Sequence, residues 1–361
     1  MTAQVWYNTG MLSEKAAKIY RETGADALYT TTDYLRRYLT GFYSTDGYVI
    51  VDAEKCVLVV DPRYFEAAEN ALKGSGVEAV EGTQARAMQL LSAYRTLGVP
   101  FPLISHSDYL DLEEKGFRLK DSYKAFTAAM KVKSEEELAC IRKACDIAEE
   151  AFLALLPQIK EGMTEREVAA VLEYEMRKRG ADGTSFDTIC AFGANGSVPH
   201  HETGDTRLKF GDPVLIDFGC KAEGYCSDIT RTFLFGDDHK HESFKKAYAE
   251  VLKAHLLVLE NLEAGMTGKQ ADAIARESLK NAGLAEAFTH SLGHGIGLNI
   301  HELPNLYPRG EEVLTDGMVF SDEPGVYFAG EFGIRIEDSV FMKDGKAVSF
   351  MTKTNKNLVI L

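Results

Sequence analysis

Hydrophobic and polar positions follow a mixed pattern in the first third of the chain. Up to about residue 125, short apolar runs alternate with stretches whose apolar positions have helical spacing. The apolar runs are ALYT, YVIV, CVLVV and PLISH, and the helical stretches are RYFEAAENALK and QARAMQLLSAYRTLG. This alternation predicts a mixed α/β domain, with strands at the apolar runs and helices between them.

A long amphipathic pattern then begins in KVKSEEELACIRKACDIAEEAFLALL. Ser134 precedes the helical positions and Glu137 follows three residues later, which is the capping-box signature of a helix N-terminus. The chain of 361 residues is also longer than one hydrophobic core usually spans. We therefore predict two domains, residues 1–125 and 126–361, with the boundary just before this helix.

The second predicted domain contains an internal repeat. EGMTEREVAAVLEYEMRKRG and AGMTGKQADAIARESLKNAG both read Gly-Met-Thr, then a helical pattern, then a glycine eighteen residues after the first one. Two predicted buried strands follow, LKFGDPVLID and LTDGMVFSDE, which align so that Asp217 matches Glu323. Chance similarity between amphipathic helices is the alternative. A true duplication that closes on itself would bring both acids into one central cleft.

Asp217 and Asp228 stand at the ends of two neighbouring predicted strands. Asp217 ends the apolar run in VLIDFG, where an unpaired buried carboxylate would be costly. Asp228 begins SDITRTFLF, whose residues alternate as in a strand. If the two runs pair as a hairpin centred on KAEG (221–224), the two acids face each other with Cβ atoms roughly 5 Å apart. Two facing buried carboxylates repel each other, so the pattern predicts a cation between them.

The second half repeats this arrangement of acids. Glu323 ends an apolar run in SDEPG, and Glu337 lies fourteen residues later in the strand pattern GIRIEDSV. His294 stands in the glycine-rich stretch SLGHGIGLNIHE. Any one acid is ordinarily a solvated or hydrogen-bonded carboxylate. Together, four carboxylates and one imidazole predict a pair of divalent cations, with Mn²⁺, Co²⁺ or Zn²⁺ as candidates.

A pair of metal ions in such a site favours hydrolytic chemistry. Two ions roughly 3.5–4 Å apart activate a bound water and polarise a carbonyl group. The glycines of SLGHGIGL are interpreted as positions where the backbone passes close to the metals and the substrate, because a Cβ atom would clash there.

Composition narrows the function further. The net charge of −15 would repel polyanions, which argues against nucleic acid as a ligand. We find neither a basic leader followed by an apolar stretch nor about 18 uninterrupted apolar residues, so we expect a soluble cytoplasmic protein that does not bind membranes. The six cysteines form no C-x-x-C pair and are interpreted as reduced core thiols. Four lone histidines are interpreted as ordinary core or surface residues: His106, His239, His241 and His255.

The motifs LIDFG, SDITRTF, SLGHGIGLNIHE, SDEPGVY and GIRIEDS resemble those of the pita-bread metallopeptidases, a family that includes methionine aminopeptidase, aminopeptidase P, prolidase and creatinase. The resemblance implies an α/β N-terminal domain and an α+β pita-bread domain with an internal pseudo-two-fold repeat. It also implies two divalent metal ions, most consistent with Mn²⁺. Asp217 would bind one ion, Asp228 and Glu337 would bridge the two, and His294 and Glu323 would bind the other.

The resemblance also assigns roles to residues around the metals. His200, in SVPHHE, matches an upstream histidine that hydrogen-bonds the reacting amide or shuttles protons, with its neighbour His201 as the alternative. His301 would stabilise the tetrahedral intermediate, and His290 would line the substrate pocket. Glu323 would accept a proton as well as bind metal. Arg335 would order the metal-site strand or contact the substrate.

The N-terminal domain separates the subfamilies. Its YLTGF stretch is similar to a signature of aminopeptidase P, prolidase and creatinase, and the complete ligand set disfavours a metal-free amidinohydrolase like creatinase. That leaves hydrolysis of Xaa-Pro bonds in proline-containing peptides. The resemblance also implies a homodimer, because such relatives are commonly dimers. Aminopeptidase P is favoured over prolidase because Asn305 stands where some prolidases place an arginine. A non-catalytic pita-bread binding module is the alternative from another class.

Overall fold

The computed structural model describes residues 11–237 and 241–361, and it divides the chain into two compact units. These are Met1–Met130 and Lys131–Leu361. The boundary predicted between residues 125 and 126 falls within helix α6 (Tyr123–Met130), so this helix belongs to the first unit. His239, one of the histidines interpreted as ordinary, lies outside the described residues.

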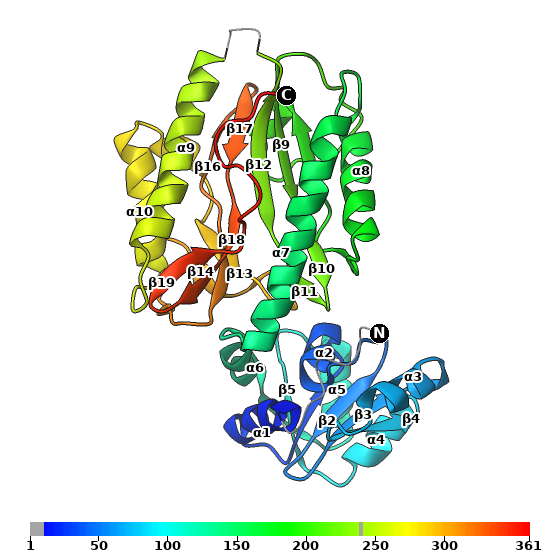
Figure 1. Cartoon of the computed structure of the whole chain (residues 1–361). Helices are drawn as coiled ribbons and strands as arrows, with labels where there is room; N and C mark the ends of the chain where they lie inside the picture. Colours follow the sequence, from blue (N-terminus) through cyan, green and yellow to red (C-terminus); the bar gives the residue numbers. More distant parts are fainter. Residues whose placement is uncertain (1–10, 238–240) are drawn as a thin grey trace. The chain divides into compact units, whose positions relative to one another are not determined.

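The first unit is built on one six-stranded mixed sheet with the order β4-β3-β2-β1-β5-β6 (Figure 1). Strands β1, β2 and β3 pair antiparallel in sequence, whereas β4, β5 and β6 join in parallel, which fits an α/β domain. The strands are β1 (Ala27–Thr30), β2 (Tyr48–Val51), β3 (Cys56–Val60), β4 (Val77–Glu81), β5 (Thr96–Val99) and β6 (Arg118–Asp121). The helices besides α6 are α1 (Met11–Thr23), α2 (Asp33–Thr40), α3 (Pro62–Leu72), α4 (Gln84–Leu91) and α5 (His106–Glu114).

Two expectations for this unit were wrong. The run PLISH forms turns and the start of α5 instead of a strand. The helix expected over QARAMQLLSAYRTLG ends at Leu91, and its last residues enter β5, which lies between β1 and β6. The apolar residues of a short buried strand also fit a helical period, so periodicity alone could not separate the two. The runs ALYT, YVIV and CVLVV are strands as predicted.

The second unit consists of two halves with matching elements. In Figure 1 its strands lie between the helix pair α7 and α8 and the helix pair α9 and α10. The first half contains α7 (Glu135–Leu155), α8 (Glu165–Lys178), β7 (Gly183–Thr184), β8 (Ile189–Phe192), β9 (Asp212–Phe218), β10 (Cys220–Ala222), β11 (Tyr225–Cys226) and β12 (Ile229–Phe235). The second contains α9 (Glu242–Asn261), α10 (Gly268–Asn281), β13 (Gly293–Gly295), β14 (Glu302–Leu306), β15 (Val319–Asp322), β16 (Gly325–Phe328), β17 (Phe332–Arg335), β18 (Asp338–Lys343) and β19 (Lys346–Ser349).

Hydrogen bonds confirm that the sequence repeat is a structural one. Helices α8 and α10 each have 14 residues, and each begins with a threonine N-cap that forms a capping box. Before α8, the backbone N–H of Gly162 donates to the carbonyl of Leu208 at 2.8 Å. Before α10, Gly265 donates in the same way to Leu314 at 2.9 Å. Both glycines have positive φ angles, 86° and 93°, which explains why a glycine precedes each Met-Thr. The second unit is therefore a duplicated α+β domain with a pseudo-two-fold axis.

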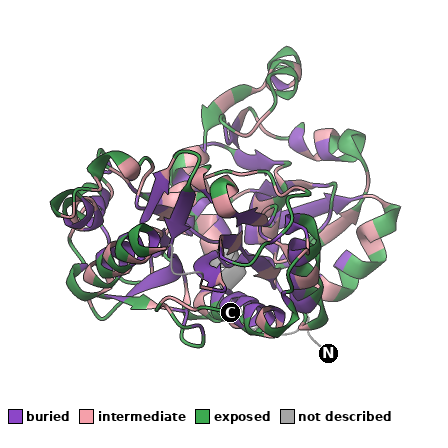
Figure 2. Cartoon of the chain, turned by 90° about the horizontal axis from the view of Figure 1, so that it is seen from above, coloured by how far each residue is buried: buried purple, intermediate pink, exposed green. Residues whose placement is uncertain are grey.

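The burial of residues differs between strands and helices. Strands are mostly buried, and helices carry exposed residues on their outer faces (Figure 2). The predicted capping box of Ser134 and Glu137 is present at the start of α7. All six cysteines are buried, as the interpretation of core thiols expected. No helix among the described residues is both long and apolar enough to cross a membrane.

Candidate metal centre

Asp217 and Asp228 lie on one face of the β9–β12 ladder, but not directly opposite each other. Asp217 pairs with Thr230, so Asp228 is displaced by two residues from the predicted register. The turn has only two central residues, Glu223 and Gly224, both with positive φ angles, and is therefore shorter than the KAEG turn expected. Because the shift is an even number of residues, both carboxylates still point to the same side.

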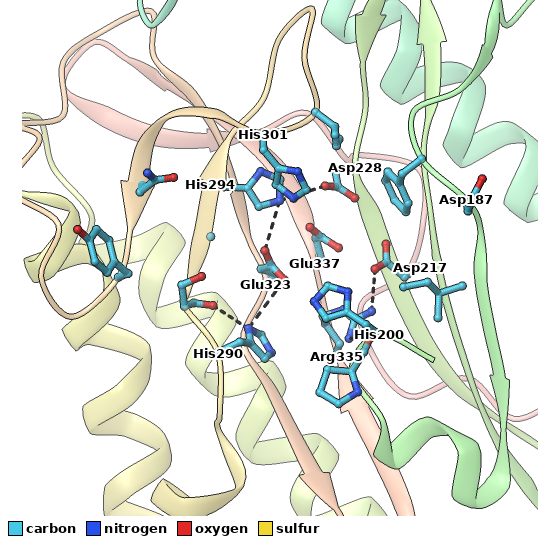
Figure 3. A pocket seen from close by; sticks show the side chains of 18 residues that line it. Asp187, His200, Asp217, Asp228, His290, His294, His301, Glu323, Arg335 and Glu337 are labelled. Carbon is cyan, nitrogen blue, oxygen red and sulfur yellow. Dashed lines mark hydrogen bonds and ion pairs between the residues drawn. The ribbon is translucent and has the colours of Figure 1, made fainter. Parts of the chain in front are cut away.

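The other three predicted ligands come from the second half. Glu323 directly follows β15, Glu337 directly precedes β18, and His294 is in the middle of β13. Together with Asp217 from β9 and Asp228, which directly precedes β12, these side chains point into one cavity of about 580 Å³ (Figure 3). All nine predicted site residues line this cavity: His200, Asp217, Asp228, His290, His294, His301, Glu323, Arg335 and Glu337.

Three of the side chains are already close enough to share an ion. Ligand atoms of Asp228, His294 and Glu337 lie within 4.8 Å of one another. The Nε2 atom of His294 lies 3.5 Å from Asp228 Oδ2 and 3.6 Å from Glu323 Oε1. Two neighbouring hydroxyls hold the glutamates, since Thr230 donates to Glu337 at 2.6 Å and Ser321 donates to Glu323 at 3.1 Å. Such outer contacts orient metal-binding carboxylates.

The electrostatics of this carboxylate group favour bound cations. Burial raises the pKa of Asp228 and of Glu337 well above their usual values, and the neighbouring carboxylates raise them further. Burial, with a smaller contribution from Asp217, raises the pKa of Glu323 to about 8. Without a cation the cluster would therefore hold protons near neutral pH. Oxygen-rich sites of this kind suit divalent metal ions, whose charge removes the repulsion.

His294 is oriented as a metal ligand requires. Its Nδ1 lies 3.1 Å from the carbonyl oxygen of Gly295, so Nδ1–H donates there and the Nε2 lone pair faces the carboxylates. Burial, together with the nearby His301, lowers the pKa of His294 to about 4. The imidazole is therefore neutral at physiological pH, and only the neutral form binds a metal.

Arg335 links Asp217 to the opposite wall of the cavity. Its Nη2 donates to Asp217 Oδ2 at 2.7 Å, and its Nη1 donates to the hydroxyl of Tyr327 at 2.6 Å. The Tyr327 hydroxyl in turn lies 3.0 Å from His290 Nε2, while His290 Nδ1 donates to the Ser291 carbonyl at 2.7 Å. The Oδ1 atom of Asp217 is buried and has no hydrogen-bond partner among the described residues, so it is free to bind a cation.

The two adjacent histidines of SVPHHE have different surroundings. His200 lines the cavity (Figure 3), whereas His201 Nε2 lies 2.9 Å from Glu165 Oε2. Glu165 is fully buried and also accepts hydrogen bonds from Asn195 and from the backbone of Gly204. His201 therefore secures the segment that carries His200, and the geometry favours His200 as the residue that meets substrate.

His301 reaches the cavity from the loop before β14. Its ring centre lies 4.3 Å from that of His294, and burial lowers its pKa. The next residue, Glu302, forms a buried ion pair with Lys133 at 2.9 Å, which fixes the loop. One of the nearby glycines also serves the packing of the strands. A Cβ atom on Gly293 would lie 1.9 Å from the carbonyl oxygen of Ser321, so this glycine makes room for the neighbouring strand β15.

Several residues in or beside the cavity were not among the predicted site residues. Tyr327 connects Arg335 with His290, and Asp187 lies at the side of the cavity (Figure 3). Asn305 pairs with His294 across the β13–β14 ladder, which places it at the same wall. Which residues face each other in this ladder is decided by how the strands pair in the folded sheet, so no local sequence pattern shows it. The remaining lining residues outside the predictions are Phe186, Ile189, Pro199, Ser291, Gly293, Ile300 and Tyr307.

Comparison with known proteins agrees with this architecture. Residues 139–344 match metallopeptidase family M24, and residues 13–130 match the creatinase/prolidase N-terminal domain. The Xaa-Pro dipeptidase of Pyrococcus furiosus is 37% identical over 96% of this chain and 99% of its own. The solved structure of an Xaa-Pro dipeptidase from Bacillus anthracis has a TM-score of 0.90 and 34% identity, covering 97% of this chain and 100% of that one. That of an X-Pro aminopeptidase from Thermotoga maritima has a TM-score of 0.87 and 33% identity, covering 95% and 99%.

A carboxylate cluster with one neutral imidazole, set in the central cavity of a duplicated α+β domain, defines a metal-dependent hydrolase. The matches to both domains are consistent with this class over nearly the whole chain. The chain belongs to metallopeptidase family M24.

Proposed function

We propose that this chain is a dinuclear, Mn²⁺-dependent exopeptidase that hydrolyses Xaa-Pro bonds, acting as an Xaa-Pro aminopeptidase. The observation that carries the proposal is the convergence of Asp217, Asp228, His294, Glu323 and Glu337 in one cavity. The names of the similar proteins, Xaa-Pro dipeptidase and X-Pro aminopeptidase, support the choice of bond. Proline has no amide hydrogen and restricts the preceding residue, so a dedicated pocket is chemically reasonable.

The residues in and beside the cavity would have separate roles in hydrolysis. When bound, the metal ions supply an activated water and polarise the scissile carbonyl. Glu323 is placed to accept a proton, because its carboxylate lies in the cavity beside the other proposed ligands. His200 is placed to donate a hydrogen bond to the scissile amide, and His301 to stabilise the developing oxyanion. Arg335 and Tyr327 hold Asp217 and His290 in position.

The charges around the cavity favour an aminopeptidase over a dipeptidase. A dipeptidase must bind the free carboxylate of its proline, which a cation does best. Among the described lining residues, Arg335 is the only lysine or arginine, and Asp217 already pairs with it at 2.7 Å. Asn305, next to His294 in the ladder, is uncharged. Dipeptidase activity is the second candidate, because two of the compared proteins are Xaa-Pro dipeptidases.

Hydrolysis of two matched peptides tests this function. Metal-stripped protein is assayed on an Xaa-Pro dipeptide and on an Xaa-Pro-Xaa tripeptide, each with and without Mn²⁺. We expect cleavage of the tripeptide only with metal, and a higher kcat/KM for the tripeptide than for the dipeptide. Preference for the dipeptide would indicate a dipeptidase. No cleavage with any divalent metal would favour the non-catalytic binding module.

Substituting Asn305→Arg should shift the preference toward dipeptides. The new guanidinium would stand beside His294 at the cavity wall and could pair with a free proline carboxylate. We expect kcat/KM for the dipeptide to rise about tenfold, since a charge-assisted hydrogen bond contributes roughly 1.5–3 kcal/mol. The same assay on Asn305→Gln, which adds length without charge, is the control. A rise of equal size in both variants would exclude charge as the cause.

A further inference from the structure

A second buried charge cluster lies behind the metal centre. Asp322 and Asp338 are the last directly paired residues of the β15–β18 ladder, and both are fully buried. Each is the sequence neighbour of a predicted ligand, Glu323 or Glu337. Successive residues of extended chain point to opposite faces, so the two aspartates face away from the side that carries the two glutamates.

His255, from the middle of α9, contacts both aspartates. Its Nδ1 lies 2.9 Å from Asp322 Oδ2, and its Nε2 lies 3.5 Å from Asp338 Oδ2. The imidazole side chain is completely buried. Asp338 also pairs with Arg231 at 2.9 Å and with Lys356 at 3.0 Å. The carboxylate of Asp322, in contrast, has no ion-pair partner other than His255 among the described residues.

The cluster is balanced in charge when His255 is protonated. Burial lowers the pKa of His255, but Asp322 and Asp338 outweigh burial and raise it to about 9. A hydrogen bond of 2.8 Å from Arg231 to Thr354 extends the cluster to the buried carboxylate of Glu149, which accepts from Thr354 at 2.7 Å. The cluster then has three acids and three bases. Its acids are Glu149, Asp322 and Asp338, and its bases are Arg231, His255 and Lys356.

Backbone pairing also joins the two ligand-bearing segments on either side of the glutamates: the β15–β18 ladder ends at Asp322 and Asp338, and the N–H of Ile336 donates to the Pro324 carbonyl at 3.3 Å. The two glutamates lie between these contacts and do not pair with each other through their backbones. Beyond the Asp322–Asp338 pair, the backbone N–H of Glu323 donates to Leu292 at 2.9 Å. The backbone N–H of Glu337 donates instead to Thr230 at 3.1 Å. The backbones of the two glutamates are therefore hydrogen-bonded to different segments, at the position where their carboxylates repel each other.

We propose that His255 is a positioning residue for the metal centre: by bridging Asp322 and Asp338 it holds together the segments that present Glu323 and Glu337, and so sets the spacing of these two ligands. The His255–Asp322–Asp338 bridge acts through the backbone of each neighbouring glutamate and touches neither metal nor substrate. Removing an outer contact of this kind typically lowers metal affinity about 10- to 100-fold. A histidine that merely filled the core would affect stability alone.

Metal binding measured without substrate tests the bridge. Mn²⁺ is titrated into the metal-stripped full-length protein by calorimetry, for His255→Gln, Asp322→Val and the double variant. His255→Gln removes the imidazole that contacts both aspartates, and Asp322→Val removes one of its two carboxylate partners, so both variants lose the His255–Asp322 contact. We expect each to bind the weaker of two Mn²⁺ ions about 10- to 100-fold less tightly. Because both act on one contact, the double variant should be no weaker than the worse single variant.

A stability-matched control separates positioning from packing. Val258→Ala truncates a fully buried apolar side chain on the same helix, about one turn beyond His255. It leaves the ion pairs of His255 with both aspartates in place. We expect it to lower the melting temperature but to leave both Mn²⁺ affinities unchanged. Wild-type affinities in His255→Gln or in Asp322→Val would overturn the proposal, and so would losses that add in the double variant. If one single variant fails to fold, the other still decides. No peptide enters the assay, so its result is independent of the proposed Xaa-Pro specificity.

Discussion

Asp228→Asn should abolish hydrolysis while it stabilises the metal-free protein. Asparagine keeps the shape of the side chain but removes the charge of a predicted bridging ligand. The metal ions would stabilise the transition state of hydrolysis by several kcal/mol, and losing this stabilisation corresponds to about a 10³-fold fall in kcat/KM. In the metal-free state, Asp228 is buried beside Glu337, Asp217 and Glu323, so removing its charge relieves repulsion. We expect the melting temperature of the metal-free variant to exceed that of wild type by on the order of 5 °C.

The pH dependence of this stabilisation identifies its cause. The folded-state pKa of Asp228 is raised above the unfolded value, so the folded protein keeps the proton to higher pH. At low pH both states are protonated and the substitution has no effect. As pH rises through the ordinary carboxyl range toward neutrality, wild type loses stability and the advantage of Asn grows. Melting curves of metal-free protein at several pH values check this.

The control for Asp228→Asn is Asp205→Asn, at an exposed ion pair with Arg166 in the same unit. Exposed pairs contribute roughly 0–1 kcal/mol, so neither activity nor melting temperature should change much. If Asp228→Asn retained Mn²⁺-dependent activity within tenfold of wild type, Asp228 would not be a bridging ligand. An unchanged melting temperature would show that the carboxylates do not repel one another in the metal-free fold.

The residues proposed as ligands could be singled out in the sequence because each stands in a local pattern that draws attention to it. An acid such as Asp217 at the end of an apolar run is costly unless a cation compensates it, and the repeat places a second acid, Glu323, at the equivalent position. The structure brings both to one cavity. The predicted hairpin register was wrong by two residues. The two acids still lie on one face, because a shift by an even number of residues does not change the face to which a side chain points.

Other parts of the site depend on long-range packing and leave no local signal. Tyr327 reaches Arg335 and His290 because β16 and β17 pair with each other, and nothing in GVYF shows that its hydroxyl is used. His255 lies in an amphipathic helix pattern and was interpreted as an ordinary residue. Its two carboxylate partners become visible only when α9 packs against β15 and β18. The sequence pattern did not show that α4 ends at Leu91, because the apolar residues of the short strand β5 fit a helical period as well as a strand period.

His200→Ala should remove most of the catalytic rate without affecting the metals. A positioned proton donor or hydrogen-bond donor typically contributes 10²–10⁴-fold, so we expect kcat to fall about 10³-fold. His200 lines the cavity but, within the part of the chain that the structure describes, forms no ion pair with the predicted ligands. Mn²⁺ affinity and melting temperature should therefore stay near wild type. Steady-state kinetics on the Xaa-Pro-Xaa tripeptide, with a parallel Mn²⁺ titration, measure the two effects separately.

The neighbouring histidine is the matched control, because His201→Ala makes the same chemical change one residue along. His201 contacts the buried Glu165 at 2.9 Å, so its loss leaves that carboxylate with fewer donors and loosens the segment that carries His200. We expect a lower melting temperature and only a modest fall in kcat. The opposite result, a large loss of kcat at unchanged stability for His201→Ala and near-normal kcat for His200→Ala, would exchange their roles. Since the two residues are adjacent in SVPHHE, only their different neighbours in the fold support this assignment.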